Sequence, residues 1–411
     1  MKRSIAIAAS VIIMSFASYA QAATDNSTAT VNQSVGGANN ASVEQDNASF
    51  TDATINQAGS VNEAEIEQTG NGNSAGVAQT GNLNNADVEQ AGNGNFARVN
   101  QTGDSNKSDV DQTGDNNSAT VAQKGNSNNA DVNQKGNGND ASVAQKGDSN
   151  TATVAQNGNG NSAEVDQKGN NNDASVAQNG NANNAEVEQN GSNNVASVEQ
   201  SGNANVADVD QTGTANKAAV EQSGDGNVAD VAQTGSGNNA EVEQSGNGNK
   251  VDLAQNGFGN TADVEQKGRS NSADVKQNGS GNSAEVDQNG SNNSAEIAQS
   301  GSANAASLDQ NGRGNEAEFE QSGSGNSADV AQKGNDNSVD IDQSGSLNIA
   351  GVAQTGNGNE VEIAQAGSSN TANVMQASSY NTANVEQAGS YNTATVSQSG
   401  GNSNVANIEQ K

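Results

Sequence analysis

The chain has 411 residues with 48 acidic and 16 basic side chains, which gives a net charge of −32. Nucleic-acid binding is disfavoured, because there is no basic groove to displace the counterions of a phosphate backbone. Cysteine and histidine are absent, so disulfides are excluded, as are the usual thiol nucleophile and imidazole base. With 2% aromatic and 30% hydrophobic residues, the composition is too poor for an ordinary globular core.

Residues 1–22 are predicted to be a secretory signal peptide. Two basic residues precede an apolar run that ends at Ala17, and Ala20 and Ala22 occupy the −3 and −1 places of a cleavage site. The run is too short to span a bilayer comfortably. The mature chain is therefore expected to be exported and to begin at Ala23, with 14 basic against 48 acidic residues.

A strict repeat follows an irregular N-terminal segment, predicted to cover residues 23–56. From Gln57 to Gln398 a glutamine recurs every 11 residues, 32 times in succession. Such fixed-period similarity is typical of repeat architectures, whose units are stable only when stacked on their neighbours. Residues 57–411 are predicted to form one regular repeat domain.

Each repeat contains an Ala-x-Val-x-Gln unit that alternates between apolar and polar positions. Side chains of a strand point alternately to opposite faces, so Ala185, Val187 and Gln189 share one face while Glu186 and Glu188 share the other. The first face is predicted to be buried and the second exposed. This period of two, with β-branched residues and a glycine in every repeat, favours a five-residue strand over a helix.

The pattern x-Gly-x-x-Asn follows each glutamine and predicts a turn, because glycine adopts the positive φ of a tight reversal. One strand and one six-residue turn make an 11-residue arc, and two arcs, or 22 residues, complete one rung. The predicted fold class is all-β, a β-solenoid with cross-β stacking of about 17 rungs.

One valine and one alanine per arc bury too little apolar surface to order eleven residues, so an isolated rung is not expected to fold. Hydrogen bonds between rungs and ladders of stacked amides are expected to supply the rest. No capping element is expected at the terminal rungs, so copies are predicted to join head to tail. The predicted ladder residues are Gln68, Asn73, Gln79, Gln90, Asn95, Gln101, Gln156, Asn161, Gln167, Gln189, Asn194 and Gln200, and the turn glycines are Gly70, Gly92, Gly158 and Gly191.

The repeat Gln-x-Gly-x-Gly-Asn-x-Ala-x-Val-x-Gln, seen unaltered from Gln68 to Gln79, from Gln90 to Gln101 and from Gln156 to Gln167, resembles the curlin repeat. The resemblance covers essentially the whole mature chain. It implies a subunit of curli fibres, which are functional amyloids of bacterial biofilms, folded as β-solenoids outside the cell. It also implies two partners, a nucleator subunit and an outer-membrane secretion channel.

The repeat number exceeds that of familiar curli subunits, so the chain looks like an expanded relative. The nucleators of that family have a more basic C-terminal region. Here the residues after 350 carry Glu360, Glu362, Glu386 and Glu409 against Lys411 alone, which favours the major, fibre-forming role.

Two alternative interpretations of the chain are a calcium-binding and an ice-binding secreted β-solenoid, each of which would stay monomeric. Stacked acids such as Asp166 and Glu188 could bind Ca²⁺, although we favour solvated gatekeepers whose mutual repulsion slows assembly. An ice-binding solenoid would present threonine arrays, whereas threonine is scattered here. No catalytic residue, metal ligand or cofactor site is predicted, and a disordered secreted spacer is the remaining alternative.

Overall fold

The computed structural model describes residues 18–22, 26–34 and 36–411, and their regular structure is entirely β-strand. Of the predicted signal peptide, residues 1–17 lie outside the described residues, and residues 18–22 form a strand. Residues 23–25 and 35 of the predicted N-terminal segment also lie outside them. Within the described residues, no helix is long and apolar enough to cross a membrane. The predicted boundaries at residues 22 and 56 stay predictions.

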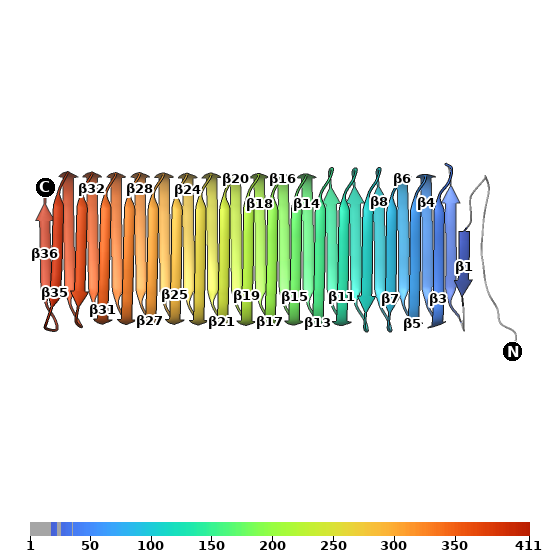
Figure 1. Cartoon of the computed structure of the whole chain (residues 1–411), viewed down its shortest axis with the longest axis horizontal. Helices are drawn as coiled ribbons and strands as arrows, with labels where there is room; N and C mark the ends of the chain where they lie inside the picture. The colour runs from blue at the N-terminus through green and yellow to red at the C-terminus, as the bar shows by residue number, and fades with distance from the viewer. Residues whose placement is uncertain (1–17, 23–25, 35) are drawn as a thin grey trace. The chain divides into compact units, whose positions relative to one another are not determined.

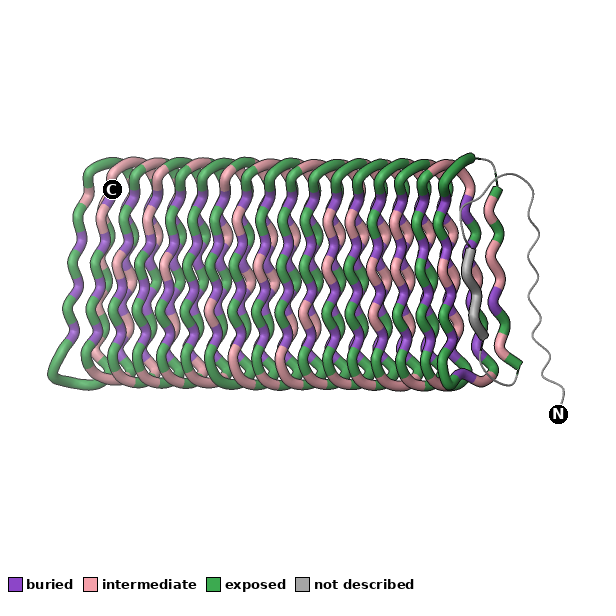
Figure 2. Tube along the Cα trace, turned by 45° about the vertical axis from the view of Figure 1, so that its right-hand side comes forward, coloured by how far each residue is buried: buried purple, intermediate pink, exposed green. Residues whose placement is uncertain are grey.

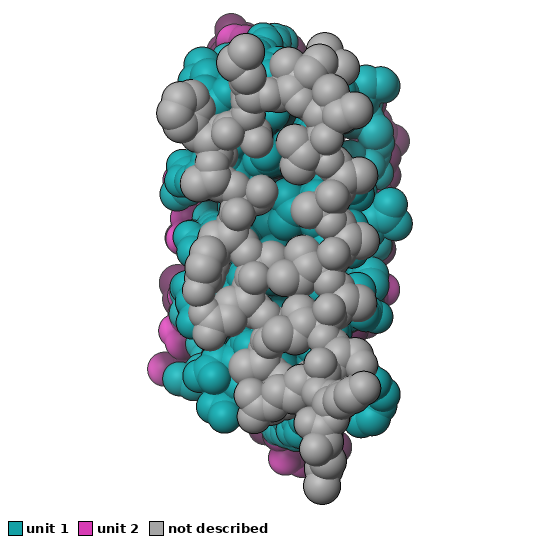
Figure 3. Space-filling view, turned by 90° about the vertical axis from the view of Figure 1, so that its right-hand side faces the viewer, with its two compact units in different colours: residues 1–204 teal, residues 205–411 magenta. Residues whose placement is uncertain are grey.

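The chain divides into two compact units, residues 1–204 and 205–411, which Figure 3 distinguishes by colour. In the described part of unit 1, strands alternate between two parallel sheets (Figure 1). The odd sheet contains β1 (Ser18–Ala22), β3 (Asn40–Ser49), β5 (Glu63–Asn71), β7 (Asn85–Ala91), β9 (Lys107–Thr113), β11 (Asn129–Asn137), β13 (Thr151–Asn159), β15 (Asp173–Asn181) and β17 (Val195–Asn203). The even sheet contains β2 (Thr28–Ser34), β4 (Asp52–Ser60), β6 (Ser74–Asn82), β8 (Phe96–Thr102), β10 (Ser118–Lys124), β12 (Asp140–Lys146), β14 (Ser162–Asn170) and β16 (Asn184–Ser192).

In unit 2 the strands likewise alternate between two parallel sheets. Its even sheet contains β18 (Val206–Thr214), β20 (Val228–Ser236), β22 (Lys250–Phe258), β24 (Ser272–Ser280), β26 (Ser294–Ser302), β28 (Glu316–Ser324), β30 (Ser338–Ser346), β32 (Glu360–Ser368), β34 (Thr382–Ser390) and β36 (Val405–Gln410). Its odd sheet contains β19 (Lys217–Asp225), β21 (Asn239–Asn247), β23 (Thr261–Arg269), β25 (Ser283–Ser291), β27 (Ala305–Arg313), β29 (Ser327–Asn335), β31 (Ile349–Asn357), β33 (Thr371–Ala377) and β35 (Thr393–Ser399).

The register of the strands confirms the predicted β-solenoid with two arcs per rung. In the even sheet of unit 1, Val143 pairs with Val165 and Val165 with Val187, so like residues stack at intervals of one rung. Unit 2 shows the same register. The first rungs are irregular, because Gln33 lies 24 residues from its partner and the β3–β5 pairing slips between Asp46 and Ser49.

Burial alternates along the strands of each unit, as Figure 2 shows in purple and green. Ala185, Val187 and Gln189 are at most 1% exposed, whereas Glu186 is exposed. The core of each unit therefore lies between its two sheets and combines alanine and valine with glutamine and asparagine. The valine column also accepts Phe319, which is completely buried.

The predicted five-residue strands are too short, because most strands have nine residues. Strand β6 continues past its glutamine through Gly81 to Asn82, and Gly59 pairs with Gly81 in the ladder. Backbone pairing thus persists through the glycine of the turn, which a pattern of side-chain alternation cannot reveal.

Candidate functional site: the amide and glycine ladders

The buried glutamines form a continuous ladder in each sheet of unit 1. In the even sheet, Nε2 of Gln79 donates a hydrogen bond of 2.9 Å to Oε1 of Gln101, and Gln101 donates to Gln123 over the same distance. In the odd sheet, Gln68 donates to Gln90 at 2.8 Å. These side chains are at most 2% exposed, so each rung satisfies the buried amides of the next.

The same glutamines also join the two sheets, a contact that the sequence analysis missed. Nε2 of Gln79 donates to the backbone oxygen of Glu63 in the opposite sheet at 2.7 Å, and Gln167 donates to that of Thr151 at 2.8 Å. Both amide hydrogens are therefore used. The signal in the sequence is that this column holds glutamine 32 times without an asparagine, because the shorter side chain lacks one methylene of reach.

The asparagine that ends each turn links backbone to backbone rather than simply stacking on its copy. Nδ2 of Asn73 donates to the carbonyl oxygen of Gly92 at 3.0 Å, and Oδ1 of Asn73 accepts the backbone N–H of Asn95 at 3.0 Å. Where side-chain amides do contact each other, Nδ2 of Asn84 donates to Asn62, in the rung that precedes it. Glutamine therefore donates to the glutamine of the following rung, whereas this buried asparagine donates to the asparagine side chain of the preceding one.

The turn glycines lie where one rung approaches the next most closely. Gly158 has a φ of 133°, and a Cβ on it would collide with the carbonyl oxygen of Gly180. Gly70 and Gly92 face the same collision with the glycine one rung on. Only glycine combines this φ with this approach.

One turn shows what happens without the glycine. Ser378 takes its place and is not in the left-handed region of φ. Its hydroxyl donates to the carbonyl oxygen of Gly401 and accepts a hydrogen bond of 2.9 Å from Nδ2 of Asn381. A serine is therefore accommodated by a local change of the turn rather than in the glycine conformation.

All sixteen ladder and turn residues predicted from the sequence lie in unit 1, and the fold sorts them by rung parity. The structure brings together residues 22 apart, such as Gln68 with Gln90, and it separates successive repeats onto opposite sheets. On the odd sheet or its turns lie Gln68, Gly70, Gln90, Gly92, Gln156, Gly158, Asn194 and Gln200; on the even sheet or the turns leading into or out of it lie Asn73, Gln79, Asn95, Gln101, Asn161, Gln167, Gln189 and Gly191.

Carboxylates stack on the outward side of the odd sheet. Glu65 pairs with Asp87, and Asp87 with Asp109, while Glu89 pairs with Asp111 in the next row. Burial, reinforced by Asp109 and Glu89, raises the pKa of Asp111 to about 6. Burial followed by repulsion from Asp109 also raises the pKa of Asp87. Stacking in register therefore imposes a charge penalty on this sheet.

We expect the folded chain to resist urea better at about pH 5 than at about pH 7. The pKa of Asp111 is raised from 3.8 to about 6, so the folded state binds a proton across this interval and the unfolded state does not. Stability therefore rises as the pH falls through 6. Urea midpoints at the two pH values measure the effect.

The variant Asp111→Asn should raise the midpoint at about pH 7 and flatten the pH dependence, because it removes the group that titrates. Asp140→Asn, a change of one charge on the exposed start of β12, is the matched control. A midpoint that falls on acidification would contradict the charge penalty.

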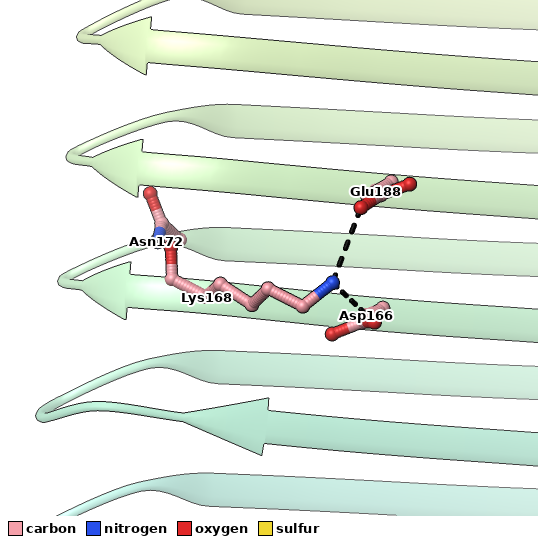
Figure 4. Close-up of polar contacts among 4 residues, drawn as sticks. All are labelled: Asp166, Lys168, Asn172 and Glu188. Atoms are coloured by element: carbon pink, nitrogen blue, oxygen red, sulfur yellow. Dashed lines mark hydrogen bonds and ion pairs between the residues drawn. The ribbon is translucent and has the colours of Figure 1, made fainter.

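A few lysines neutralise such rows locally. Nζ of Lys168 lies 2.8 Å from Asp166 and 3.2 Å from Glu188 on the next even strand (Figure 4). Hydrogen bonding to Asp166 and then to Glu188 raises the pKa of Lys168. Among the residues that the structure describes, no group of three or more acids is arranged to hold a metal ion.

The comparisons with known proteins agree with this geometry. A family model described as "Curlin associated repeat" matches fourteen overlapping segments that together run from residue 59 to residue 411. The segments are 59–92, 81–114, 114–147, 147–180, 169–202, 180–213, 202–235, 213–246, 246–279, 268–301, 301–334, 334–367, 367–400 and 381–411. No curated protein matched the chain in a direct sequence search.

Proposed function

Since this chain belongs to the curlin-repeat family, whose members are structural proteins typical of extracellular curli fibres, we propose that it is the major subunit of such a fibre. Copies assemble as an amyloid at the bacterial cell surface and contribute to a biofilm matrix. A nucleator subunit and an outer-membrane secretion channel are the proposed partners. The predicted signal peptide supports export.

The observation that carries this proposal is the sameness of successive rungs. In unit 1, Ala119, Val121 and Gln123 pair with Ala141, Val143 and Gln145, and the same residue types meet again one rung later. The surface that one rung presents to the next is therefore repeated along the chain. A rung from a second copy can satisfy the same backbone and amide groups, which is the principle of cross-β assembly.

The ladders also impose a direction on this assembly. Every glutamine-to-glutamine bond described above runs from Nε2 of one rung to Oε1 of the rung that follows it in sequence, as from Gln145 to Gln167 and from Gln167 to Gln189. A second copy continues the ladder only when it has the same orientation. Assembly is therefore head to tail, and such a contact between unlike surfaces does not close on itself.

We expect the purified mature chain to form unbranched filaments that bind thioflavin T, after a lag that preformed seeds abolish. The lag should shorten on acidification from about pH 7 to about pH 5, because protonation relieves repulsion between the stacked acids. Fluorescence kinetics with negative-stain microscopy measure both results. A strand-rich chain that stays monomeric with and without seeds would refute the fibre proposal, and a lag independent of pH would refute gatekeeping by the acids.

A further inference from the structure

Over strands β5 to β12, the two outward faces of unit 1 differ sharply in charge. We define the even face as three outward rows on β6, β8, β10 and β12, whose strands pair in register. Every residue of these rows is described, and none is a carboxylate, although the chain carries 48 acids. The rows are Gly76, Arg98, Thr120 and Ser142; Ala78, Asn100, Ala122 and Ala144; and Thr80, Thr102, Lys124 and Lys146.

The lysines of the even face have no ion-pair partner in the described chain, and the nearest acids lie outside its three rows. Lys124 and Lys146 pair in register on neighbouring strands and are exposed. Neither takes part in an ion pair of the described chain, whereas Lys168, one strand further, is held by Asp166 and Glu188 (Figure 4). Like charges in register repel each other, so two such lysines favour an external anionic partner.

Two shallow hollows lie along these cations. One, of about 320 Å³, is lined by Lys124 and Lys146 with Ala122 and Ala144, and at its edge by Asp166, which Lys168 neutralises. The other, of about 280 Å³, is lined by Arg98, Phe96 and, on β4, Asp52, and it is open where Gly76 lacks a side chain. Phe96 is 43% exposed. The even face thus combines positive charge with small residues that let a partner approach closely.

The opposite side of the same rungs has the reverse character. We define the odd face as the outward acidic rows of β5, β7, β9 and β11, which are Glu65, Asp87, Asp109 and Asp131 in one row and Glu67, Glu89 and Asp111 in the other. Oδ1 of Asp87 is buried without a hydrogen-bond partner. Lys107 and Lys135 are the cations on these four strands. The odd face therefore has an excess of negative charge that the unit itself does not neutralise.

We propose that the even face of one copy docks against the odd face of a second copy, so that Arg98, Lys124 and Lys146 pair with the stacked acids. The two faces point away from each other within one copy, which leaves each free for another molecule. Both sets of charges repeat at the same inter-strand spacing of about 4.8 Å, so several pairs form together when the strands of the two copies stack in the same direction. The partner is thus a second copy of this chain, because its acids repeat at the spacing of the cations.

The area of this contact is too small to hold two isolated copies together. Four strands at about 4.8 Å and five residues at about 3.3 Å per residue give a face of roughly 300 Å², well below the roughly 800 Å² per partner of a stable interface. One pair of copies therefore associates weakly. Within filaments, many such contacts act together. The inference rests in this respect on the proposed fibre function, and it predicts side-by-side bundling of filaments.

Reversing the charges of either face by mutation tests the docking. Filaments are grown separately from the wild type, from Lys124→Glu/Lys146→Glu and from Glu67→Lys/Glu89→Lys, and bundle width is measured by negative-stain microscopy. The first variant sets acids against the odd face, and the second sets two lysines against Lys124 and Lys146, so the filaments of each should bundle less than the wild type. Mixing the two preformed variants brings unaltered even faces against unaltered odd faces and should restore bundles. Lys217→Glu/Lys250→Glu, which makes the same charge change on exposed sites of unit 2, should bundle like the wild type. Salt of about 1 M, where the Debye length is about 3 Å, should disperse wild-type bundles.

Bundling that survives in Lys124→Glu/Lys146→Glu, or that mixing does not restore, would overturn the docking while leaving the fibre function intact. If no filaments form, the fibre proposal fails, and sedimentation velocity at low salt then tests the docking on the soluble chain. Association of the wild type that Lys124→Glu/Lys146→Glu abolishes would support the docking. Equal sedimentation of the two chains would overturn it. If the even face captures soluble poly-glutamate and the polymer leaves bundling unchanged, the face binds a polyanion instead, and this result would also overturn the docking.

Discussion

Gly158→Ala is expected to destabilise the chain by at least about 3 kcal/mol, because the substitution combines a left-handed conformation with a backbone collision. The φ of Gly158 is 133°, and the added Cβ would strike the carbonyl oxygen of Gly180 in the next rung. That oxygen accepts the hydrogen bond of 2.9 Å from Nδ2 of Asn161. Relief of the collision would therefore move the backbone and break the asparagine link between rungs.

Gly160→Ala is the matched control in the same turn. Gly160 has a φ of 64°, but a Cβ on it would meet nothing within 4 Å. Two repeats further, Ala182 occupies the same position with a φ of 56°, so alanine is tolerated there. We expect a cost of about 1 kcal/mol from the left-handed conformation alone. Urea unfolding of the soluble chain measures both variants, and equal effects would show that the close approach of the rungs does not matter.

Gln167→Met is the second substitution with a large expected effect. The methionine has a similar size, but it removes a bond from Gln145, a bond to Gln189 and the bond of 2.8 Å to the carbonyl oxygen of Thr151. Gln167 is completely buried, so water cannot replace these partners. Each buried group left unpaired costs about 1 to 3 kcal/mol, which predicts a loss of about 3 kcal/mol or more.

The loss is measured as the shift in urea midpoint and, on the fibre proposal, as slower thioflavin T kinetics. Ser162→Ala, at the exposed start of the same strand, should change neither. Gln167→Glu adds an independent readout, since a buried carboxylate is destabilising when ionised and should be tolerated better at about pH 5 than at about pH 7. Wild-type stability of Gln167→Met would mean that the ladder is not a stabilising element.

Much of the fold follows from the sequence, because a repeat constrains every copy at once. The alternation of Ala185, Val187 and Gln189 with Glu186 and Glu188 predicts which side of the strand is buried, and the structure agrees. The strands extend further than that alternation suggested, since pairing through the turn glycines involves only backbone atoms.

The hydrogen bonds of the ladders could not be predicted from the sequence. The columns of glutamine and asparagine are evident in the sequence, but their bonds are not. The contact of Gln79 with the opposite sheet depends on the separation of the two sheets, and the link from Asn73 to Gly92 depends on how closely the turns stack. Distances of this kind are set by packing and not by the order of residues along the chain.

The sequence by itself determined the period, the buried columns, the place of the glycines and the family resemblance, because these are properties of each repeat and of its spacing. The tertiary structure alone decided which charges become neighbours. Lys124 and Lys146 are separated in sequence by the arc of β11, which carries Asp131, yet they stack in register on one face while Asp109 and Asp131 stack on the other. Closing a rung after two arcs sorts successive repeats onto opposite faces. A chain with a net charge of −32 thereby acquires a local basic face.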